Sequence, residues 1–185
     1  MLSGATRATC WRADASAPLP DTVSFDLGGW CRSWMENWKD TPRGADFAVR
    51  ITHTAQVHTQ PALVGQILDN LLDNAVKYAP DGTAVNASAR LSGGSVETVM
   101  SNATGQHRPD ADRMFDRFYR ADPSRSSAAG GVGLGLAISR ELAAAMKGRL
   151  WADFDDTGNL RLHLLLPAAR EPEKKAEPEA PAAVA

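Results

Sequence analysis

Cysteine, excess charge and long apolar runs are all scarce in this sequence of 185 residues, and each scarcity excludes some classes of protein. The two cysteines, Cys10 and Cys31, lack the spacing of metal ligands, and the sequence identifies no disulfide partner for either, which predicts a reducing, cytoplasmic setting. A net charge of −2 gives no reason to expect attraction to nucleic acid or to a membrane surface. Residues 1–20 contain no long apolar run, so neither a secretory signal nor a membrane span is expected there.

The most informative stretch is an amphipathic pattern between Pro61 and Tyr78. Residues three or four positions apart share a helix face. The two faces here are an apolar one of Leu63, Ile67, Leu71 and Ala75 and a polar one of Gln66, Asn70, Asn74 and Lys77. A solvated helix face is normally rich in Glu and Lys, whereas this one aligns carboxamides with a lysine. Carboxamide oxygens can coordinate a hard cation and a lysine can bind phosphate, although the same side chains could equally be ordinary exposed residues.

A glycine-rich run, Gly131 to Leu136, opens a second helical pattern that continues to about Lys147. Glycines spaced two apart let the backbone approach a ligand closely, and the N–H groups of a helix start point toward an anion. The run is not a P-loop, because no Lys-Ser/Thr pair follows it, and no strand leads directly into it. Alone it could be a structural turn, but together with the asparagine-bearing helix it predicts a phosphate contact.

Three motifs, taken in order, resemble those of bacterial sensor histidine kinases. Residues 70–78 resemble the N box, residues 114–122 the F box and residues 131–136 the G2 box, and the resemblance covers roughly Val23 to Pro167. It implies an α+β fold, the two-layer α/β sandwich (Bergerat ATP-binding fold) that gyrase-type ATPases share. In that fold the helices pack on one face of a mixed β-sheet, and an ATP lid, here residues 122–130, lies beside the nucleotide.

The other patterns divide the chain into three parts. Residues 1–22 are a predicted flexible lead-in, at the place where the resemblance puts the end of a dimerisation domain; residues 23–168 form the ATP-binding catalytic domain; and residues 169–185 form a disordered tail. Within the domain, periodicity predicts helices at 26–39, 61–78, 109–120 and 135–147, and strands at 47–52, around 57, and at 85–91, 96–100, 150–152 and 160–166. The first of these helices carries Trp30, Trp34 and Trp38 on one face, which predicts a core face packed on the sheet.

The resemblance also implies the ligands and the residues that bind them. ATP and Mg²⁺ are expected, with Mg²⁺ held by Asn70 and Asn74, the phosphate charge balanced by Lys77, and the adenine flanked by Tyr78. The glycine-rich element would contact the phosphates through Gly131, Gly133, Leu134, Gly135 and Leu136. Phosphoryl transfer needs a cation near the γ-phosphate, so Arg117 and Arg120 join Asn74 and Lys77 as catalytic candidates, although both arginines could equally be surface charges.

One element departs from the family pattern. After the strand that ends near Ser101, histidine kinases usually carry Asp-x-Gly-x-Gly, whose carboxylate accepts the adenine amino proton. Here Asn102 stands at the aspartate position, and Gly105 is the only glycine that remains. The amide oxygen of an asparagine can still accept that hydrogen bond, so Asn102 and Gly105 are assigned to the ATP site. The segment could equally be a simple turn after the strand.

Asn70 bears on the type of reaction. Gyrase-type hydrolases carry a glutamate at this helix position to activate water, whereas a carboxamide cannot abstract a proton. The site is therefore expected to transfer the γ-phosphate to another nucleophile, which in this family is a histidine followed by an acidic residue. The four histidines of this chain, His53, His58, His107 and His163, all lack such a neighbour.

The resulting hypothesis is the catalytic domain of a sensor histidine kinase, which would not autophosphorylate alone. Its expected partners are the histidine-bearing dimerisation domain of the same kinase and a downstream response regulator, without nucleic acid or membrane contact by these residues. The expected location is the cytoplasm, including the cytoplasmic portion of a membrane-anchored sensor. Two alternatives stay open: a degenerate module that binds nucleotide or only a partner protein, and an ATPase clamp of the gyrase or mismatch-repair type, which Asn70 argues against.

Overall fold

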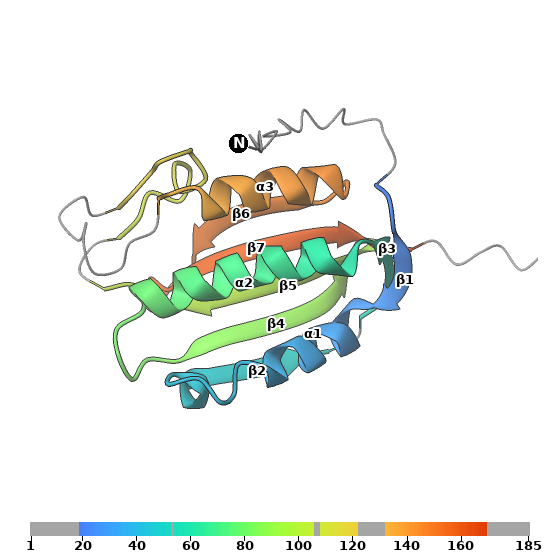
Figure 1. Ribbon diagram of the computed structural model, residues 1–185. Coiled ribbons are helices and arrows are strands. Elements are labelled where there is room, and N and C mark those ends of the chain that lie inside the picture. Colours follow the sequence, from blue (N-terminus) through green and yellow to red (C-terminus); the bar gives the residue numbers. More distant parts are fainter. Residues whose placement is uncertain (1–18, 53, 106–107, 122–131, 170–185) are drawn as a thin grey trace, which may run out of the picture.

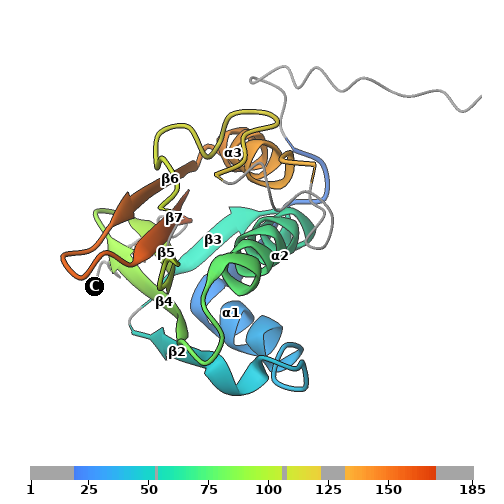
Figure 2. The ribbon, with the colours of Figure 1, turned by 90° about the vertical axis from the view of Figure 1, so that its left-hand side faces the viewer.

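The computed structural model describes residues 19–52, 54–105, 108–121 and 132–169, and their centre is a five-stranded mixed β-sheet (Figure 1). The strand order is β2 (Phe47–Ile51), β4 (Val85–Ser92), β5 (Ser95–Asn102), β7 (Leu160–Pro167) and β6 (Arg149–Phe154). Strands β2 and β4 are parallel, and the other neighbouring pairs are antiparallel. Helices α1 (Leu27–Glu36), α2 (Pro61–Tyr78) and α3 (Gly135–Ala145) lie on one face of this sheet, as the end-on view in Figure 2 shows.

Two short strands and one turn of 3₁₀ helix complete the described elements. Strand β1 (Val23–Asp26) pairs with β3 (Gln56–Thr59) in a separate antiparallel ribbon, and η1 (Gly44–Asp46) precedes β2. The ribbon is tied to the end of β7 by a bridge between Val57 and Ala168. Regular structure therefore runs from Val23 to Ala168, while the assignment of residues 1–22 and 169–185 to a flexible lead-in and tail stays a prediction.

The core lies between the helices and the sheet, because alternate side chains of a strand point to opposite faces. In β7 the four leucines at even positions are buried in the core cluster: Leu160, Leu162, Leu164 and Leu166. Helix α2 contributes the facing layer with Val64, Ile67, Leu68, Leu71, Leu72 and Ala75. Each buried leucine contributes about 2 kcal/mol of hydrophobic stabilisation, so this layer sets the position of α2 on the sheet.

Residues at the helix starts determine where α1 and α2 begin, and one side-chain contact links the two helices. Asp26 caps α1 by accepting hydrogen bonds from the backbone N–H groups of Gly28 and Gly29, at 3.3 and 2.8 Å. Pro61 occupies the first turn of α2, where its missing N–H costs nothing. The indole nitrogen of Trp34 donates to the Asp69 carboxylate at 2.8 Å, which links α1 to α2.

The predicted fold and most predicted elements are confirmed. The tryptophan face of α1 packs inward as expected, with Trp34 buried and Trp30 and Trp38 packed against the core cluster. The predicted helix at 109–120 is wrong: the structure has successive turns there and no α-helix within residues 108–121. The predicted lid, residues 122–130, lies outside the described residues, as do His53 and His107.

The segment begins as a helix would but does not continue as one. The Asp110 carboxylate accepts hydrogen bonds from the backbone N–H groups of Asp112 and Arg113, the same capping contacts that Asp26 makes at the start of α1. Phe118 then adopts a positive φ of 66°, and its N–H bonds to the carbonyl of Gly133 at 2.9 Å. Phe115 is buried in the core, whereas Phe118 is 67% exposed.

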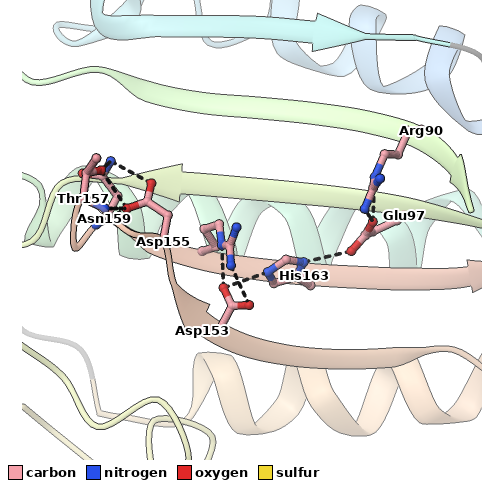
Figure 3. Close-up of polar contacts among 8 residues, drawn as sticks. Arg90, Glu97, Asp153, Asp155, Thr157, Asn159 and His163 are labelled. Atoms are coloured by element: carbon pink, nitrogen blue, oxygen red, sulfur yellow. Dashed lines mark hydrogen bonds and ion pairs between the residues drawn. The ribbon is translucent and has the colours of Figure 1, made fainter.

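The sheet face that the helices leave open carries a polar network (Figure 3). His163 on β7 bonds through its two ring nitrogens to Glu97 on β5 at 3.0 Å and to Asp153 on β6 at 3.1 Å. Arg90 pairs with Glu97, and Arg161 pairs with Asp153 through two nitrogens. Both ring nitrogens of His163 therefore have partners within the sheet.

In the described part of the chain, no helix combines the length and the apolar character that crossing a bilayer requires.

Candidate functional site

The predicted site residues gather at one end of the sandwich. The C-terminal half of α2, the end of β5, the start of α3 and residues 108–121 all lie at the left end of the view in Figure 1. Helix α2 packs against both α3 and β5, so the asparagine-bearing helix sits between the other two parts of the site. Sequence positions more than sixty residues apart are therefore brought to one place, as the contact of Asn70 with Ser139 shows.

Asn70 is held by the helix that follows the glycine-rich run. Its side-chain nitrogen donates to the hydroxyl oxygen of Ser139 at 3.0 Å and to the carbonyl oxygen of Gly135 at 3.4 Å. Because the nitrogen of this amide is engaged by α3, its Oδ1 is the atom left to bind a cation. A Cβ added to Gly135 would stand 3.5 Å from that oxygen, so the glycine keeps the space beside it open.

Asn74, Lys77 and Tyr78 follow on the next turns of α2. Asn74 is half-buried, and its side chain makes no hydrogen bond to the described residues. Lys77 lies in the last turn, where a cation is favoured by the partial negative charge of a helix C-terminus, and its side chain is exposed. Tyr78 is 43% exposed, so its ring can flank a ligand without being released from the core.

The start of α3 offers backbone donors. Leu134 occupies the N-cap position, and no described side chain caps the helix, so the first N–H groups of α3 lack a side-chain acceptor there. Gly133 has a φ of 73°, and an added Cβ would meet the backbone of Phe118 and Tyr119 at 2.9 to 3.0 Å. The Leu136 side chain is buried in the core, so this residue could contact a phosphate only through its backbone. Gly131 lies outside the described residues.

Asn102 ends β5 with an unsatisfied acceptor. Its side chain is 2% exposed, and its amide nitrogen donates to the carbonyl of Ala103 at 2.8 Å. Its Oδ1 is buried and has no partner among the described residues. Burying a polar atom without a hydrogen bond costs free energy, and such an atom in a native fold suggests a missing ligand or water. Gly105, by contrast, is exposed, with open space around its Cα.

The two candidate arginines belong to the turns of residues 108–121. Arg117 forms an exposed ion pair with Glu141 of α3, at 2.7 Å, which ties these turns to the helix. Arg120 is half-buried and is also engaged in an interaction. The contacts described for these arginines do not involve Asn74 or Lys77, so their role near a γ-phosphate stays a prediction.

Sequence reasoning missed two residues that shape this site. Ser139 is fully buried on α3 and accepts the hydrogen bond that orients Asn70. Tyr119 accepts a hydrogen bond from the backbone N–H of Asp110 at 2.9 Å, which closes the turns of residues 108–121. A serine on the apolar side of a helical pattern is the only signal for Ser139 in the sequence, and its partner could not be read from it.

The groups at this end could bind an anion through backbone N–H groups and a cation through amide oxygens. Among the described residues, no group of three or more His, Cys, Asp or Glu side chains could hold a metal ion. A hard cation at this end would therefore depend on the carboxamide oxygens of Asn70 and Asn74 and on ligand oxygens. The buried acceptor of Asn102 fits a ligand that presents an N–H donor.

Comparison with known proteins gives a consistent family. Residues 59–170 match the family described as histidine kinase-, DNA gyrase B-, and HSP90-like ATPase. The sensor-like histidine kinase SenX3 of Mycolicibacterium smegmatis is 41% identical over 111 residues, which cover 58% of this chain and 28% of that protein. SenX3 of Mycobacterium bovis is 33% identical over 178 residues, 91% of this chain and 43% of that protein. The chain thus spans less than half the length of these two relatives.

Solved structures show the same fold. Full-length ShkA, crystallised in complex with AMPPNP, superposes with a TM-score of 0.67 at 26% sequence identity, over 84% of this chain and 33% of that one. The arrangement of a mixed sheet with helices on one face is shared with this relative, in agreement with the fold predicted above.

Proposed function

Because this chain belongs to the family of histidine kinase-, DNA gyrase B-, and HSP90-like ATPases, as a domain of the sensor histidine kinase type, we propose that it transfers the γ-phosphate of ATP to a histidine. The acceptor histidine would lie on the dimerisation domain of the same kinase, and a response regulator would receive the phosphoryl group from it. Mg²⁺ is the proposed second ligand. In the transfer, a ring nitrogen of the acceptor attacks the γ-phosphorus, the bond to the β–γ bridging oxygen breaks, ADP leaves, and the ring loses its proton to solvent.

The observation that carries this proposal is the fixed carboxamide of Asn70. Hydrolases of the gyrase type need a carboxylate at this position to activate water, and Asn70 cannot take up a proton. Its nitrogen is bound by Ser139 and Gly135, so only its oxygen is available to the site. This arrangement supports metal binding and disfavours water activation, which is the requirement of a transferase.

The other residues would divide the binding of MgATP. Asn74 with Asn70 would supply amide oxygens to Mg²⁺, which when bound neutralises phosphate charge. The uncapped N–H groups of α3 would bind phosphate oxygens, and Lys77 would add a positive charge. Asn102 would accept the adenine amino proton with the Oδ1 that has no partner among the described residues.

Titration calorimetry with AMPPNP, with and without Mg²⁺, tests the binding half of the proposal. The unaltered chain is expected to bind, with an affinity that falls when Mg²⁺ is removed, and Asn74→Ala is expected to abolish the Mg²⁺-dependent part. Asn86→Ala, at an exposed asparagine of β4, is the matched control and should bind as the unaltered chain does. Absence of binding by the unaltered chain would favour the alternative of a module that binds only a partner protein.

Transfer is tested by mixing the chain with the separately produced dimerisation domain of its parent kinase and radiolabelled ATP. Label is expected on the histidine of that domain, and Asn74→Ala should prevent its appearance. Binding without transfer would support the degenerate nucleotide-binding module. Steady Mg²⁺-dependent release of phosphate without an acceptor would instead favour the alternative of an ATPase clamp of the gyrase or mismatch-repair type.

A further inference from the structure

Arg43, in the loop between α1 and η1, uses its whole guanidinium group. Its Nε donates to the Asp46 carboxylate at 2.9 Å. One terminal nitrogen donates to the carbonyls of Val76 and Ala79 at 3.0 and 3.1 Å, and the other donates to those of Pro80 and Thr83 at 3.1 and 3.2 Å. A guanidinium carries five N–H donors, so every donor of Arg43 has an acceptor. Its side chain is only 16% exposed, so the group is held within the protein.

The acceptors belong to the end of α2 and to the turn that follows it. The last carbonyls of a helix have no partner within the helix and commonly bond to a glycine-containing cap. Helix α2 has no such cap, because Ala79 is extended, with φ −69° and ψ 135°, as expected for the residue before a proline. The guanidinium therefore takes the place of a backbone cap, and its charge is favoured by the helix dipole.

The loop that carries Arg43 is built tightly. The N–H of Gly44 donates to the carbonyl of Thr41 at 2.8 Å, and that of Asp46 donates to the carbonyl of Arg43 at 2.9 Å. A Cβ on Gly44 would overlap the carbonyl oxygen of Lys39, so only glycine fits beside the arginine. The loop thus fixes the direction in which Arg43 points.

We propose that Arg43 is a positioning residue for the nucleotide site. Arg43 binds the carbonyl of Val76, in the last turn of α2, and the carbonyl of Ala79, directly after the helix. Lys77 and Tyr78 lie between these two positions in the sequence, so Arg43 holds the turn that carries them. The inference rests on the proposed function, because it assumes that Lys77 and Tyr78 contact ATP. Positive charge alone does not suffice, since a lysine has three donors on one atom and cannot reach acceptors spread around a planar fork.

The test compares Arg43→Lys and Arg43→Met with Arg50→Lys and Arg50→Met, the same substitutions at an exposed arginine of β2. Three quantities are measured for each: urea unfolding, the Kd of AMPPNP with Mg²⁺, and amide hydrogen exchange without nucleotide. The Ala79 amide is the reporter for exchange, because it donates to the carbonyl of Ala75 at 2.8 Å and closes the last turn of α2. Asp46→Asn adds a milder variant that alters only the Nε contact.

Arg43→Lys is expected to raise the Kd of AMPPNP about tenfold, the size of one misplaced charge-assisted contact. Urea unfolding shows whether the variant is folded under the conditions of the binding measurement. Faster exchange at Ala79 should accompany the higher Kd, and the two Arg50 variants should change neither quantity. An Arg43→Lys variant that is less stable but binds AMPPNP as the unaltered chain does would overturn the inference and leave the proposed function intact. Failure of the unaltered chain to bind would overturn the proposed function itself, which separates the two results.

Discussion

The side-chain nitrogen of Asn70 lies 3.0 Å from the hydroxyl oxygen of Ser139, so one hydrogen bond joins the middle of α2 to the first turns of α3. Ser139 is fully buried, and the bond is therefore protected from competing water. Its consequence is that the helix bearing the proposed metal ligands and the helix bearing the proposed phosphate donors hold each other's orientation. Substitutions that break this bond should affect both ligand contacts together.

Ser139→Ala is the first such substitution. It leaves the Asn70 amide with only its 3.4 Å contact to Gly135, so that the amide can rotate. We expect a loss of about 1 kcal/mol in the free energy of unfolding and a several-fold weaker Mg²⁺-dependent binding of AMPPNP. Urea denaturation measures the first quantity and calorimetry the second.

The control is Ser33→Ala, the same change at an exposed serine of α1. Its stability should stay within about 0.5 kcal/mol of the unaltered chain, as is usual for surface positions. If Ser139→Ala binds AMPPNP with unchanged Mg²⁺ dependence, the orientation of Asn70 by α3 has no part in ligand binding.

The elements that sequence predicted correctly are those with strong periodicity. Strand β7 and helix α2 each bury one face. Their apolar residues therefore recur with the period of a strand or of a helix, and this period can be read from the local sequence. The apolar spacing of residues 109–120 is helical, so the sequence predicts a helix where the structure has turns. The Asp110 side chain favours a helix start, but the positive φ of Phe118 and its bond to Gly133, fifteen positions later in the chain, keep the segment from continuing as a helix.

The candidate site residues could be named from the sequence, where they stay a prediction, but the contacts that hold them in place could not. Asn70, Asn74 and Asn102 could be named because carboxamides at those places suit cation and adenine binding. The contact of Asn70 with Ser139 and the clamp by Arg43 join residues far apart in the chain, and no local spacing encodes such partners. Tertiary packing supplies them, so they appear only in the folded protein.

Glu97 should make stability depend on acid pH. Burial alone would raise the pKa of this carboxyl, but hydrogen bonds from His163 and Arg90 outweigh it and hold the pKa below its ordinary value. A carboxyl with a lowered pKa stabilises the folded state above its unfolded pKa, about 4.3, and loses this contribution as the pH falls through the folded value. Glu97→Gln is therefore expected to cost about 2 kcal/mol near neutral pH, and the difference should shrink in more acidic solution.

Urea unfolding of Glu97→Gln and the unaltered chain, from about pH 6 down to about pH 3, measures this difference. Glu36→Gln serves as the control, since Glu36 is in an exposed ion pair with Lys39 that contributes little. A cost for Glu97→Gln that stays constant across the whole range would show that shape, and not charge, explains the loss.

Cys31 should be inert in the folded protein. Desolvation by burial raises the pKa of its thiol to about 12, and the side chain is packed in the core. Since the thiolate is the reactive form, Cys31 should not react with a disulfide reagent at about pH 8 until the chain unfolds. The assay uses a Cys10→Ser variant, so that one thiol is counted, and compares the folded chain with the chain in urea. Rapid labelling of the folded chain would mean that the core around α1 opens readily.

Asn102 should select the base of the nucleotide. Its nitrogen is bound to the carbonyl of Ala103, so a buried acceptor, Oδ1, is left for the ligand. Adenine offers an amino donor where guanine offers a carbonyl acceptor, so ATP should bind more tightly than GTP. Asn102→Ala should weaken ATP binding about tenfold or more and remove this preference. Asn86→Ala, at an exposed position of β4, should leave both affinities unchanged. Equal affinity of the unaltered chain for ATP and GTP in calorimetric titrations would show that the buried oxygen of Asn102 does not contact the base.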